Sequence, residues 1–263
     1  YVLHDTMSAG LTFDPASVAV TIGQQKLAKD TDYTLVTSDL TDGCTFEVQF
    51  KDGVLKPNDV VEVAYSAKVN EKAVIGGTGN DNKTQLKYGE DKKTEWDETH
   101  TYVWQFDVFK YAVKDKKEIP LAGARFILYK TVNDEKFYAQ AANGKITGWT
   151  DDQEKATVFE TPDDGKFVIA GLDADTYYLE ETKAPDGYNR LKEPVNVVIT
   201  ANIASGKTVT ATITYNETAT GTVRIENQTG VELPSTGGIG TTVFYVIGGL
   251  LMGVAVVLLV TRK

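Results

Sequence analysis

The sequence has 263 residues, of which 41% are hydrophobic and 24% charged, and its 27 Lys and Arg against 37 Asp and Glu give a formal net charge of −10. This length predicts about two domains, and the composition excludes a collagen, a disordered tail and a coiled coil. An acidic chain without a Lys/Arg-rich stripe binds nucleic acid poorly, because phosphate contacts supply most of that affinity, so we expect no nucleic-acid partner.

Metal and cofactor chemistry has few candidate residues in this sequence. The single cysteine, Cys44, excludes a disulfide framework and a Cys₄ zinc site. The two histidines, His4 and His100, are too few for a His₃ or HExxH metal centre. We therefore expect neither a metal nor a cofactor. The sequence also has no GxSxG motif, Ser/His/Asp set or phosphate loop, which predicts that the chain is not an enzyme.

Residues 1–90 predict a domain of short strands joined by Gly, Asp and Asn turns. Residues 1–5 are typical of a strand that is already under way, and no signal peptide precedes them. We therefore expect the sequence to be part of a longer protein, with a first domain that is truncated at its N-terminus. Cys44 shares one face of a predicted strand with Phe46 and Val48, which predicts a small core residue rather than a reactive thiol.

Residues 91–101 are polar and predict a linker to a second strand-rich domain, residues 102–229. Short strands of the second domain alternate with Gly, Asn and Asp turn signals, which is the pattern of a β-sandwich. Two Asp pairs, at 151–152 and 163–164, lack the spaced ligand series of a calcium loop and are predicted as turns. We therefore expect an all-β protein with tandem immunoglobulin-like β-sandwich domains.

Three polar residues of the second domain continue strand faces that should be buried. In each of three strands, an apolar face that follows the two-residue alternation ends in a polar residue. The residue is Lys110 in the first strand, Glu181 in an intermediate strand and Asn227 in the last strand. Each could sit at a strand end and reach solvent, as lysine often does. Alternatively, all three point inward. In the core, an unpaired charge raises the free energy of the folded state by many kcal/mol, and such a side chain usually shifts its pKa and becomes neutral.

An inward arrangement of these three side chains would support one reaction. A neutral Lys110 amine is a nucleophile. A protonated Glu181 can hydrogen-bond the Asn227 carboxamide, polarise it and then shuttle protons. Attack of the amine on the side-chain carbonyl would expel ammonia and leave a Lys–Asn isopeptide bond. The bond would remove the buried charge that makes the arrangement unfavourable.

The last part of the chain, residues 230–263, contains an uncharged apolar run at 239–260 and a basic end. A helix of this run would be about 33 Å long, enough for a hydrocarbon core of about 30 Å. The terminal basic residues would put that end in the cytoplasm. We therefore expect a C-terminal transmembrane helix. Directly before it stands a short motif, which consists of Leu233, Pro234, Ser235, Thr236 and Gly237.

The motif, the apolar span and the basic end together resemble the LPxTG cell-wall sorting signal of Gram-positive surface proteins. The resemblance implies that a sortase attacks the carbonyl of Thr236, releases Gly237 onward, and passes the acyl group to a peptidoglycan precursor or a neighbouring subunit. Pro234 would hold the peptide extended, and Gly237 would let the enzyme approach the scissile bond. The implied protein is held in the membrane before sorting and is then covalently attached to the cell wall, at the cell surface.

A second resemblance covers residues 102–263. Residues 177–188 match the E-box of Gram-positive pilins, YxLxETxAPxGY, at every fixed position. The first and last strands of the domain resemble those of the SpaA-type, Cna-B-like pilin domain. This resemblance implies that Lys110 and Asn227 are joined by an isopeptide bond and that Glu181 catalyses the joining.

Residues 5–13 and 64–70 resemble the preceding domain of backbone pilins. Many such domains form their own isopeptide bond with an Asn that follows a Leu-x-Tyr strand, and Glu90 stands at that position here. The Tyr-Pro-Lys pilin motif, whose amine receives the next subunit, does not occur in these residues.

These resemblances imply a structural function. The chain would be a subunit of a sortase-assembled pilus, or a pilin-like surface protein, and its only chemistry would be its own cross-link. The alternative is a monomeric wall-anchored adhesin that binds a host ligand. A Tyr-Pro-Lys motif in a region before Tyr1 would favour the pilus subunit over the adhesin.

Overall fold

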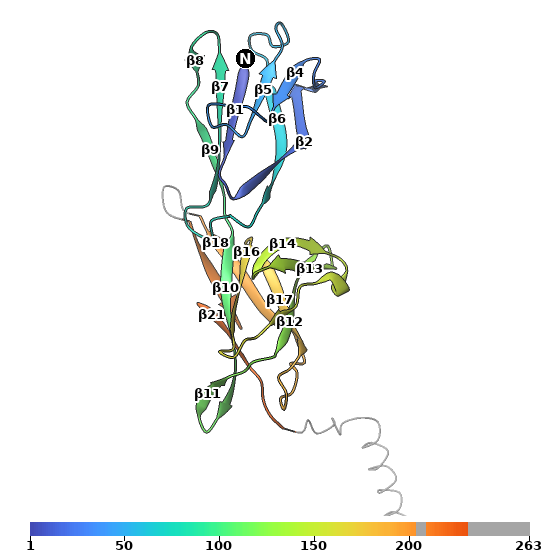
Figure 1. The fold of residues 1–263 in the computed structure, drawn as a ribbon, viewed down its shortest axis with the longest axis vertical. Helices are drawn as coiled ribbons and strands as arrows, with labels where there is room; N and C mark the ends of the chain where they lie inside the picture. The colour runs from blue at the N-terminus through green and yellow to red at the C-terminus, as the bar shows by residue number, and fades with distance from the viewer. Residues whose placement is uncertain (204–208, 231–263) are drawn as a thin grey trace, which may run out of the picture.

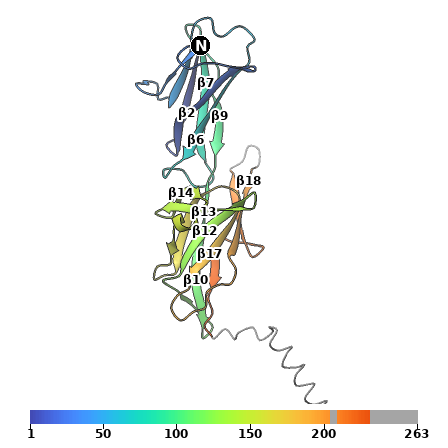
Figure 2. The ribbon, with the colours of Figure 1, turned by 90° about the vertical axis from the view of Figure 1, so that its right-hand side faces the viewer.

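The computed structural model describes residues 1–203 and 209–230, which form β-strands almost throughout. Two β-domains lie end to end along the long axis of the molecule (Figure 1, Figure 2). A short 3₁₀ helix, η1 (Gln153–Lys155), is the only helix among the described residues. No helix in this part of the chain has the length and hydropathy of a membrane span. The predicted all-β tandem fold is confirmed, and the predicted transmembrane helix at 239–260 lies outside the described residues.

The first domain consists of two sheets that share one core. The larger sheet has the strand order β4-β5-β1-β7-β8, with β9 also paired to β7, and the smaller has the order β3-β2-β6. The larger sheet contains β1 (Val2–Met7), β4 (Tyr33–Val36), β5 (Phe46–Phe50), β7 (Asn80–Tyr88), β8 (Lys92–Lys93) and β9 (Asp97–Thr101). The smaller contains β2 (Leu11–Ile22), β3 (Gln25–Lys26) and β6 (Val61–Val69). The buried core comprises Val20, Leu27, Tyr33, Phe46 and Val48.

The segment 91–101, predicted as a linker, belongs to the first sheet. It contains β8 and β9, and β9 pairs with β7 from Asn80↔Thr101 to Thr84↔Asp97. All five residues of β9 are exposed. A strand that buries neither face needs no apolar residues, so its sequence lacks the periodicity by which strands are recognised. The first domain is therefore longer, and the connection to the second domain shorter, than the sequence predicts.

Cys44, predicted as a small core residue, is half-buried and lies outside that core, two positions before β5. Its Sγ lies 3.4 Å from Nδ1 of His4. Strand parity misleads here because β5 buries residues of both faces, including Phe46 and the charged Glu47.

The second domain is one continuous hydrogen-bonded sheet that folds around its own core. Its strand order is β11-β10-β16-β14-β13-β12-β17-β18-β19-β20, with β15 paired to β12 and β21 paired to β10. The strands of its first half are β10 (Trp104–Lys114), β11 (Lys117–Pro120), β12 (Arg125–Val132), β13 (Glu135–Ala142), β14 (Lys145–Thr150) and β15 (Phe159–Glu160). Those of its second half are β16 (Lys166–Leu172), β17 (Thr176–Lys183), β18 (Val195–Asn202), β19 (Thr210–Tyr215), β20 (Thr218–Ala219) and β21 (Thr222–Glu226).

Tight turns set the register of this sheet. Four hairpins, β10–β11, β12–β13, β13–β14 and β19–β20, are closed by two residues that both have positive φ, for example Asn143 (51°) and Gly144 (76°). Such turns match the right-handed twist of the strands they join. The twist and register then decide which side chains of each strand face the core.

The face alternation predicted from the sequence is confirmed in this core. The inward residues are buried on three strands: Phe106, Val108 and Lys110 on β10, Tyr177, Leu179 and Glu181 on β17, and Val223, Ile225 and Asn227 on or directly after β21. The three polar residues are thus the ends of otherwise apolar rows, and the alternative in which each reaches solvent is wrong.

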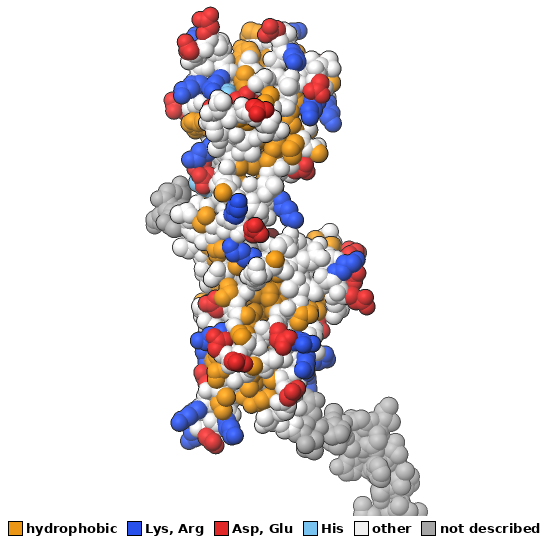
Figure 3. Space-filling view, viewed as in Figure 1, with side chains coloured by type: hydrophobic (Ala, Val, Ile, Leu, Met, Phe, Trp, Pro, Cys, Tyr) orange, Lys and Arg blue, Asp and Glu red, His pale blue; other side chains and the backbone are white. Residues whose placement is uncertain are grey.

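The two domains meet over a short connection. The Gly76 N–H donates a hydrogen bond to the Val103 carbonyl at 2.8 Å, and Nζ of Lys145 donates to the Glu71 carbonyl at 2.8 Å. Over the face shown in Figure 3, acidic and basic side chains are interspersed on both domains. Charge is therefore not segregated between the two domains on this face.

Candidate functional site

The three inward polar residues meet at one place in the core of the second domain. Lys110 lies on β10, Glu181 on β17, and Asn227 directly after β21. β10 and β21 are parallel neighbours, with Lys110 opposite Ile225. The Asn227 N–H donates to the Tyr111 carbonyl at 2.9 Å. The backbone pairing therefore continues beyond β21 and holds Asn227 beside Lys110.

Each side chain of this Lys–Glu–Asn triad contacts the other two. Nζ of Lys110 donates a hydrogen bond to Oδ1 of Asn227 and another to the Ile225 carbonyl at 3.2 Å. The same Nζ lies 3.7 Å from Oε1 of Glu181. Nδ2 of Asn227 donates to both carboxylate oxygens of Glu181, at 3.1 and 3.2 Å. The Leu191 N–H donates to Oε2 of Glu181 at 2.8 Å, which orients the carboxylate.

The triad is closed off from water, and this changes the chemistry of the amine. Lys110, Glu181 and Asn227 are 0%, 2% and 1% exposed. Burial lowers the pKa of Lys110 to about 8, although the nearby Glu181 carboxylate acts in the opposite direction. A substantial fraction of the amine is then neutral near physiological pH, and the neutral amine is the nucleophilic form.

The backbone at Lys110 is held by the turn that precedes β16. The Lys110 N–H donates to the Gly165 carbonyl at 2.8 Å, and the Lys110 carbonyl accepts from the Leu121 N–H at 3.0 Å. Gly165 has a φ of +68°, and a Cβ at this position would lie 2.4 Å from the Lys110 carbonyl oxygen. Only glycine permits this approach, so the turn fixes the strand position from which the amine extends.

This arrangement suits acyl transfer between two side chains. The amine of Lys110 lies against the carbonyl end of the Asn227 carboxamide, and the amide nitrogen that would leave is hydrogen-bonded to Glu181. Glu181 contacts both the nitrogen that would lose a proton and the nitrogen that would gain one. The sorting motif at 233–237 lies outside the described residues.

The first domain buries a polar cluster that the sequence did not indicate. Asp5 is 0% exposed, and its Oδ2 accepts hydrogen bonds from Tyr65 Oη at 2.6 Å and Asn82 Nδ2 at 3.0 Å. Burial raises the pKa of Asp5, while these two hydrogen bonds lower it. The three residues come from β1, β6 and β7, so no short motif marks them. Glu90, at the position where the resemblance places an Asn, is exposed in the turn after β7.

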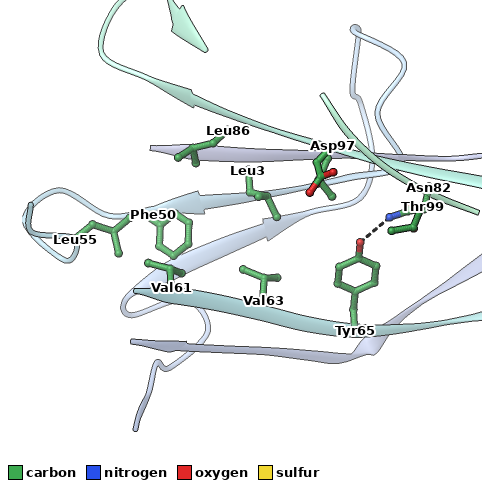
Figure 4. A pocket seen from close by; sticks show the side chains of 11 residues that line it. Leu3, Phe50, Leu55, Val61, Val63, Tyr65, Asn82, Leu86, Asp97 and Thr99 are labelled. Atoms are coloured by element: carbon green, nitrogen blue, oxygen red, sulfur yellow. Dashed lines mark hydrogen bonds between the residues drawn. The ribbon is translucent and has the colours of Figure 1, made fainter. Parts of the chain in front are cut away.

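Beside this cluster lies a pocket of about 400 Å³ between the two sheets of the first domain. Its lining is mostly apolar, with Leu3, Phe50 and Val63 among the residues, and the hydrogen-bonded pair Tyr65 and Asn82 forms one end (Figure 4). No described lysine is among the groups that contact Asp5. Among the described residues, the amine–carboxamide–carboxylate contact seen in the triad therefore has no counterpart at this cluster.

Three family models together match most of the chain. The Gram-positive pilin backbone subunit 2, Cna-B-like domain, matches residues 1–92. The SpaA prealbumin-like fold domain matches residues 105–217, and the LPXTG cell wall anchor motif matches residues 225–263. The chain is therefore a surface protein attached to the cell wall and built from pilin-type β-domains.

One curated protein is similar to the chain over almost its whole length. The trypsin-resistant surface T6 protein of Streptococcus pyogenes is 26% identical over an alignment that covers 99% of this chain and 60% of that protein. This chain is similar to that surface protein along almost its whole length. It spans about three fifths of the length of this curated relative.

Solved pilin structures share the fold. The group B streptococcus pilus 2b backbone protein has a TM-score of 0.60 at 22% identity, covering 89% of this chain and 87% of that one. The Corynebacterium diphtheriae major pilin SpaA, described as a modular pilus assembly with stabilizing isopeptide bonds, has a TM-score of 0.56 at 19% identity, covering 86% of this chain and 58% of that one. At these identities the likeness shows the fold.

Proposed function

We propose that the chain is a structural subunit of a sortase-assembled pilus, or a pilin-like surface protein, whose second domain is stabilised by an isopeptide bond between Lys110 and Asn227. The observation that carries the proposal is the contact between a buried amine and a buried carboxamide, with a carboxylate against both. The matches to a pilin backbone domain and to a SpaA domain, and the described isopeptide bonds of the similar Corynebacterium diphtheriae pilin, support it.

The bond forms once per chain, and the reaction balances within the triad. The neutral Nζ of Lys110 attacks Cγ of Asn227, and a bond between them replaces the Cγ–Nδ2 bond. Glu181 takes a proton from Nζ and delivers one to Nδ2, which leaves as ammonia and takes its electron pair with it. Glu181 ends in its starting protonation state. The product is a secondary amide in place of a buried amine and a primary amide, so the cost of holding a charge away from water disappears.

Intact mass tests the bond directly. The purified full chain is expected to weigh one ammonia less than its sequence, and a tryptic digest is expected to contain a branched peptide joining Lys110 to Asn227. Lys110→Ala should restore the sequence mass. Lys114→Ala, an exposed lysine of the same strand, is the matched control and should keep the deficit. A wild-type mass equal to the sequence mass after complete folding would leave the triad as a polar cluster only.

The anchoring step is proposed at 233–237, where a sortase would cleave between Thr236 and Gly237 and pass Thr236 to an amine of peptidoglycan or of a neighbouring pilin. Thr236→Ala is expected to leave the protein unlinked to the wall, and wall-derived peptides of the wild type should end at Thr236. Normal covalent attachment of the Thr236→Ala protein would contradict this step. On a denaturing gel of wall extracts, a ladder supports a pilus subunit, whereas a single wall-linked species supports a monomeric surface protein.

A further inference from the structure

Four side chains that can each ligate a metal ion meet in the first domain, far from the triad. They come from β1, from the loop 37–45 and from β5, and we call them the His4 cluster: His4, Asp42, Cys44 and Glu47. Their ligand atoms all lie within 4.8 Å of one another. The sequence predicted no metal site, because one cysteine and two histidines are too few for the common zinc centres. Only the folded sheet brings His4 to Cys44, which lies 40 positions later.

Strand register and one threonine hold the cluster in place. His4 of β1 lies directly opposite Glu47 of β5 in the antiparallel pair, where facing side chains are close enough to interact. The loop 37–45 ends at Thr45, whose Oγ1 accepts a hydrogen bond from the Met7 N–H at 2.8 Å. The end of the loop is thereby fastened to β1, which brings Asp42 and Cys44 to the side chain of His4.

Nδ1 of His4 lies at the centre of the cluster. It is 2.9 Å from Oδ2 of Asp42, 3.0 Å from Oε1 of Glu47 and 3.4 Å from Sγ of Cys44. A histidine ring nitrogen can donate one hydrogen or accept through one lone pair. It therefore cannot satisfy two carboxylates and a thiol at the same time. Ligands at about 2.0–2.3 Å around a tetrahedral Zn²⁺ are separated from one another by about 3.3–3.7 Å, so the three distances from Nδ1 lie within about half an ångström of that range.

The two carboxylates are already oriented toward His4. Oδ1 of Asp42 accepts from the Cys44 N–H at 3.3 Å, and Oε2 of Glu47 accepts from Nε2 of Gln49 at 2.8 Å. These bonds occupy one oxygen of each carboxylate and leave the other oxygen for the centre of the cluster. Outer hydrogen bonds of this kind orient metal ligands and raise affinity.

The cluster is buried on one side and open on the other. The His4 side chain is 6% exposed and that of Asp42 is 35% exposed, so a cation has access past Asp42. Nζ of Lys87 lies 3.4 Å from Oδ2 of Asp42, but its side chain is 46% exposed and free to move into solvent. Burial, and next the hydrogen bond to Asp42, raise the pKa of the Cys44 thiol to about 11. Without a cation this thiol is protonated, and a bound metal would replace its proton.

We propose that the His4 cluster binds one Zn²⁺ or a similar divalent transition-metal ion. One nitrogen, one sulfur and two oxygen ligands in a compact fourfold arrangement suit Zn²⁺, whereas Ca²⁺ takes six to eight oxygen ligands. The ion would fasten the loop 37–45 to β1. This inference rests on the first domain alone and does not depend on the isopeptide bond or on wall attachment.

The single cysteine makes a direct test possible, because any thiol reagent reports on Cys44 alone. In the full chain held in detergent, Zn²⁺ is expected to block alkylation of Cys44 by a maleimide, and EDTA is expected to restore it. Co²⁺ in place of Zn²⁺ should give a thiolate-to-metal charge-transfer band, with one ion bound per chain. His4→Gln removes a direct ligand and should weaken Zn²⁺ binding by more than the roughly 10–100-fold that follows loss of an outer hydrogen-bond partner. Cys44→Ser should abolish the Co²⁺ band.

His100→Gln is the matched control, because the exposed His100 belongs to a second group with the half-buried Asp81 and the exposed Glu98. This variant should bind Zn²⁺ as tightly as the wild type and show the same thiol protection. Equal alkylation of wild-type Cys44 with and without Zn²⁺ would overturn the proposal, and so would an equal loss of binding in His4→Gln and His100→Gln. The wild-type measurement needs no variant, so a misfolded His4→Gln protein cannot decide the outcome.

Discussion

Glu181 is the residue on which the proposed chemistry depends, because its carboxylate contacts both nitrogen atoms of the triad. Removing the carboxylate leaves the amine against the carboxamide without a group to carry the proton between them. The E-box places this glutamate by its spacing along one strand. Its function nevertheless requires β10 and β21, which lie far from it in the sequence, to bring the other two residues to it.

Glu181→Ala is therefore expected to yield a folded domain with the full sequence mass. Glu180→Ala provides the matched control, since Glu180 is its neighbour on the other face of β17 and is partly exposed. The control should show the ammonia deficit. Intact mass spectrometry of both proteins after overnight folding checks the prediction, and an ammonia deficit in Glu181→Ala would assign the proton transfer to another group.

Stability should depend on pH in a way that reveals the unbonded amine. In Asn227→Ala, Lys110 keeps a pKa that burial has lowered to about 8, against 10.5 in the unfolded chain. Between these values the unfolded state binds a proton that the folded state does not, so the free energy of unfolding rises with pH across this window. The gain is on the order of 3 kcal/mol, and it is absent below pH 8.

Denaturant unfolding of Asn227→Ala across that pH window measures how the free energy of unfolding changes with pH. The double variant Lys110→Met/Asn227→Ala gives the contribution of all other titratable groups, which is subtracted. In the wild type the proposed bond converts the amine into an amide that does not titrate, so Lys110 should contribute no such slope. The same slope in both variants would show that Lys110 is not its source.

How far the sequence predicted the site can be seen from individual residues. Lys110, Glu181 and Asn227 were found because each continues an apolar row, and this local pattern survives folding. The cluster around Asp5 and the His4 cluster were missed. Their members come from separate strands and a loop, and each is an ordinary polar residue in its own segment. They come together only when β1 pairs with β5 and β7 and the sheet that contains β6 packs against them.

At the scale of elements, β10 and β21 form the pair that the proposed bond would join. They are the first and last strands of the second domain, and they run parallel and side by side. The sequence predicted both strands from their alternation, but not their parallel pairing, which depends on the path of the whole domain. It also missed β9, whose residues are all exposed and carry no pattern.

A bond between these strands closes a loop of 117 positions. By analogy with a disulfide, such a loop removes about 4–5 kcal/mol of entropy from the unfolded state. Glu181→Ala and Asn227→Ala should each lower the stability of the second domain by about this amount. The double variant should lose little more, because each change removes the same bond. Denaturant unfolding monitored on the second domain, with the first domain as an internal reference, tests this prediction. Additive losses of stability in the double variant would refute a shared cause.

At the scale of the molecule, two domains lie end to end, and the chain passes from one to the other where β9 leads into β10 (Figure 1). Tension along the long axis therefore enters the second domain at the start of β10 and leaves after β21. With the bond in place, the force passes from Lys110 to Asn227. The sheet between them then carries almost no load, because a covalent bond takes the place of its hydrogen-bonded strands.

The last prediction follows from this path. When the full chain is stretched in a single-molecule experiment, the wild type should lengthen only as the first domain unfolds, since residues 111–226 lie inside the closed loop. Glu181→Ala should show a second unfolding event that releases about 400 Å of chain, at about 3.5 Å per residue. The first domain acts as a marker in both proteins, so a missing event cannot be mistaken for a failed attachment. A second event of that length in the wild type would mean that force does not pass through Lys110 and Asn227. Unfolding of the first domain at the same force in both proteins would confine the difference to the second.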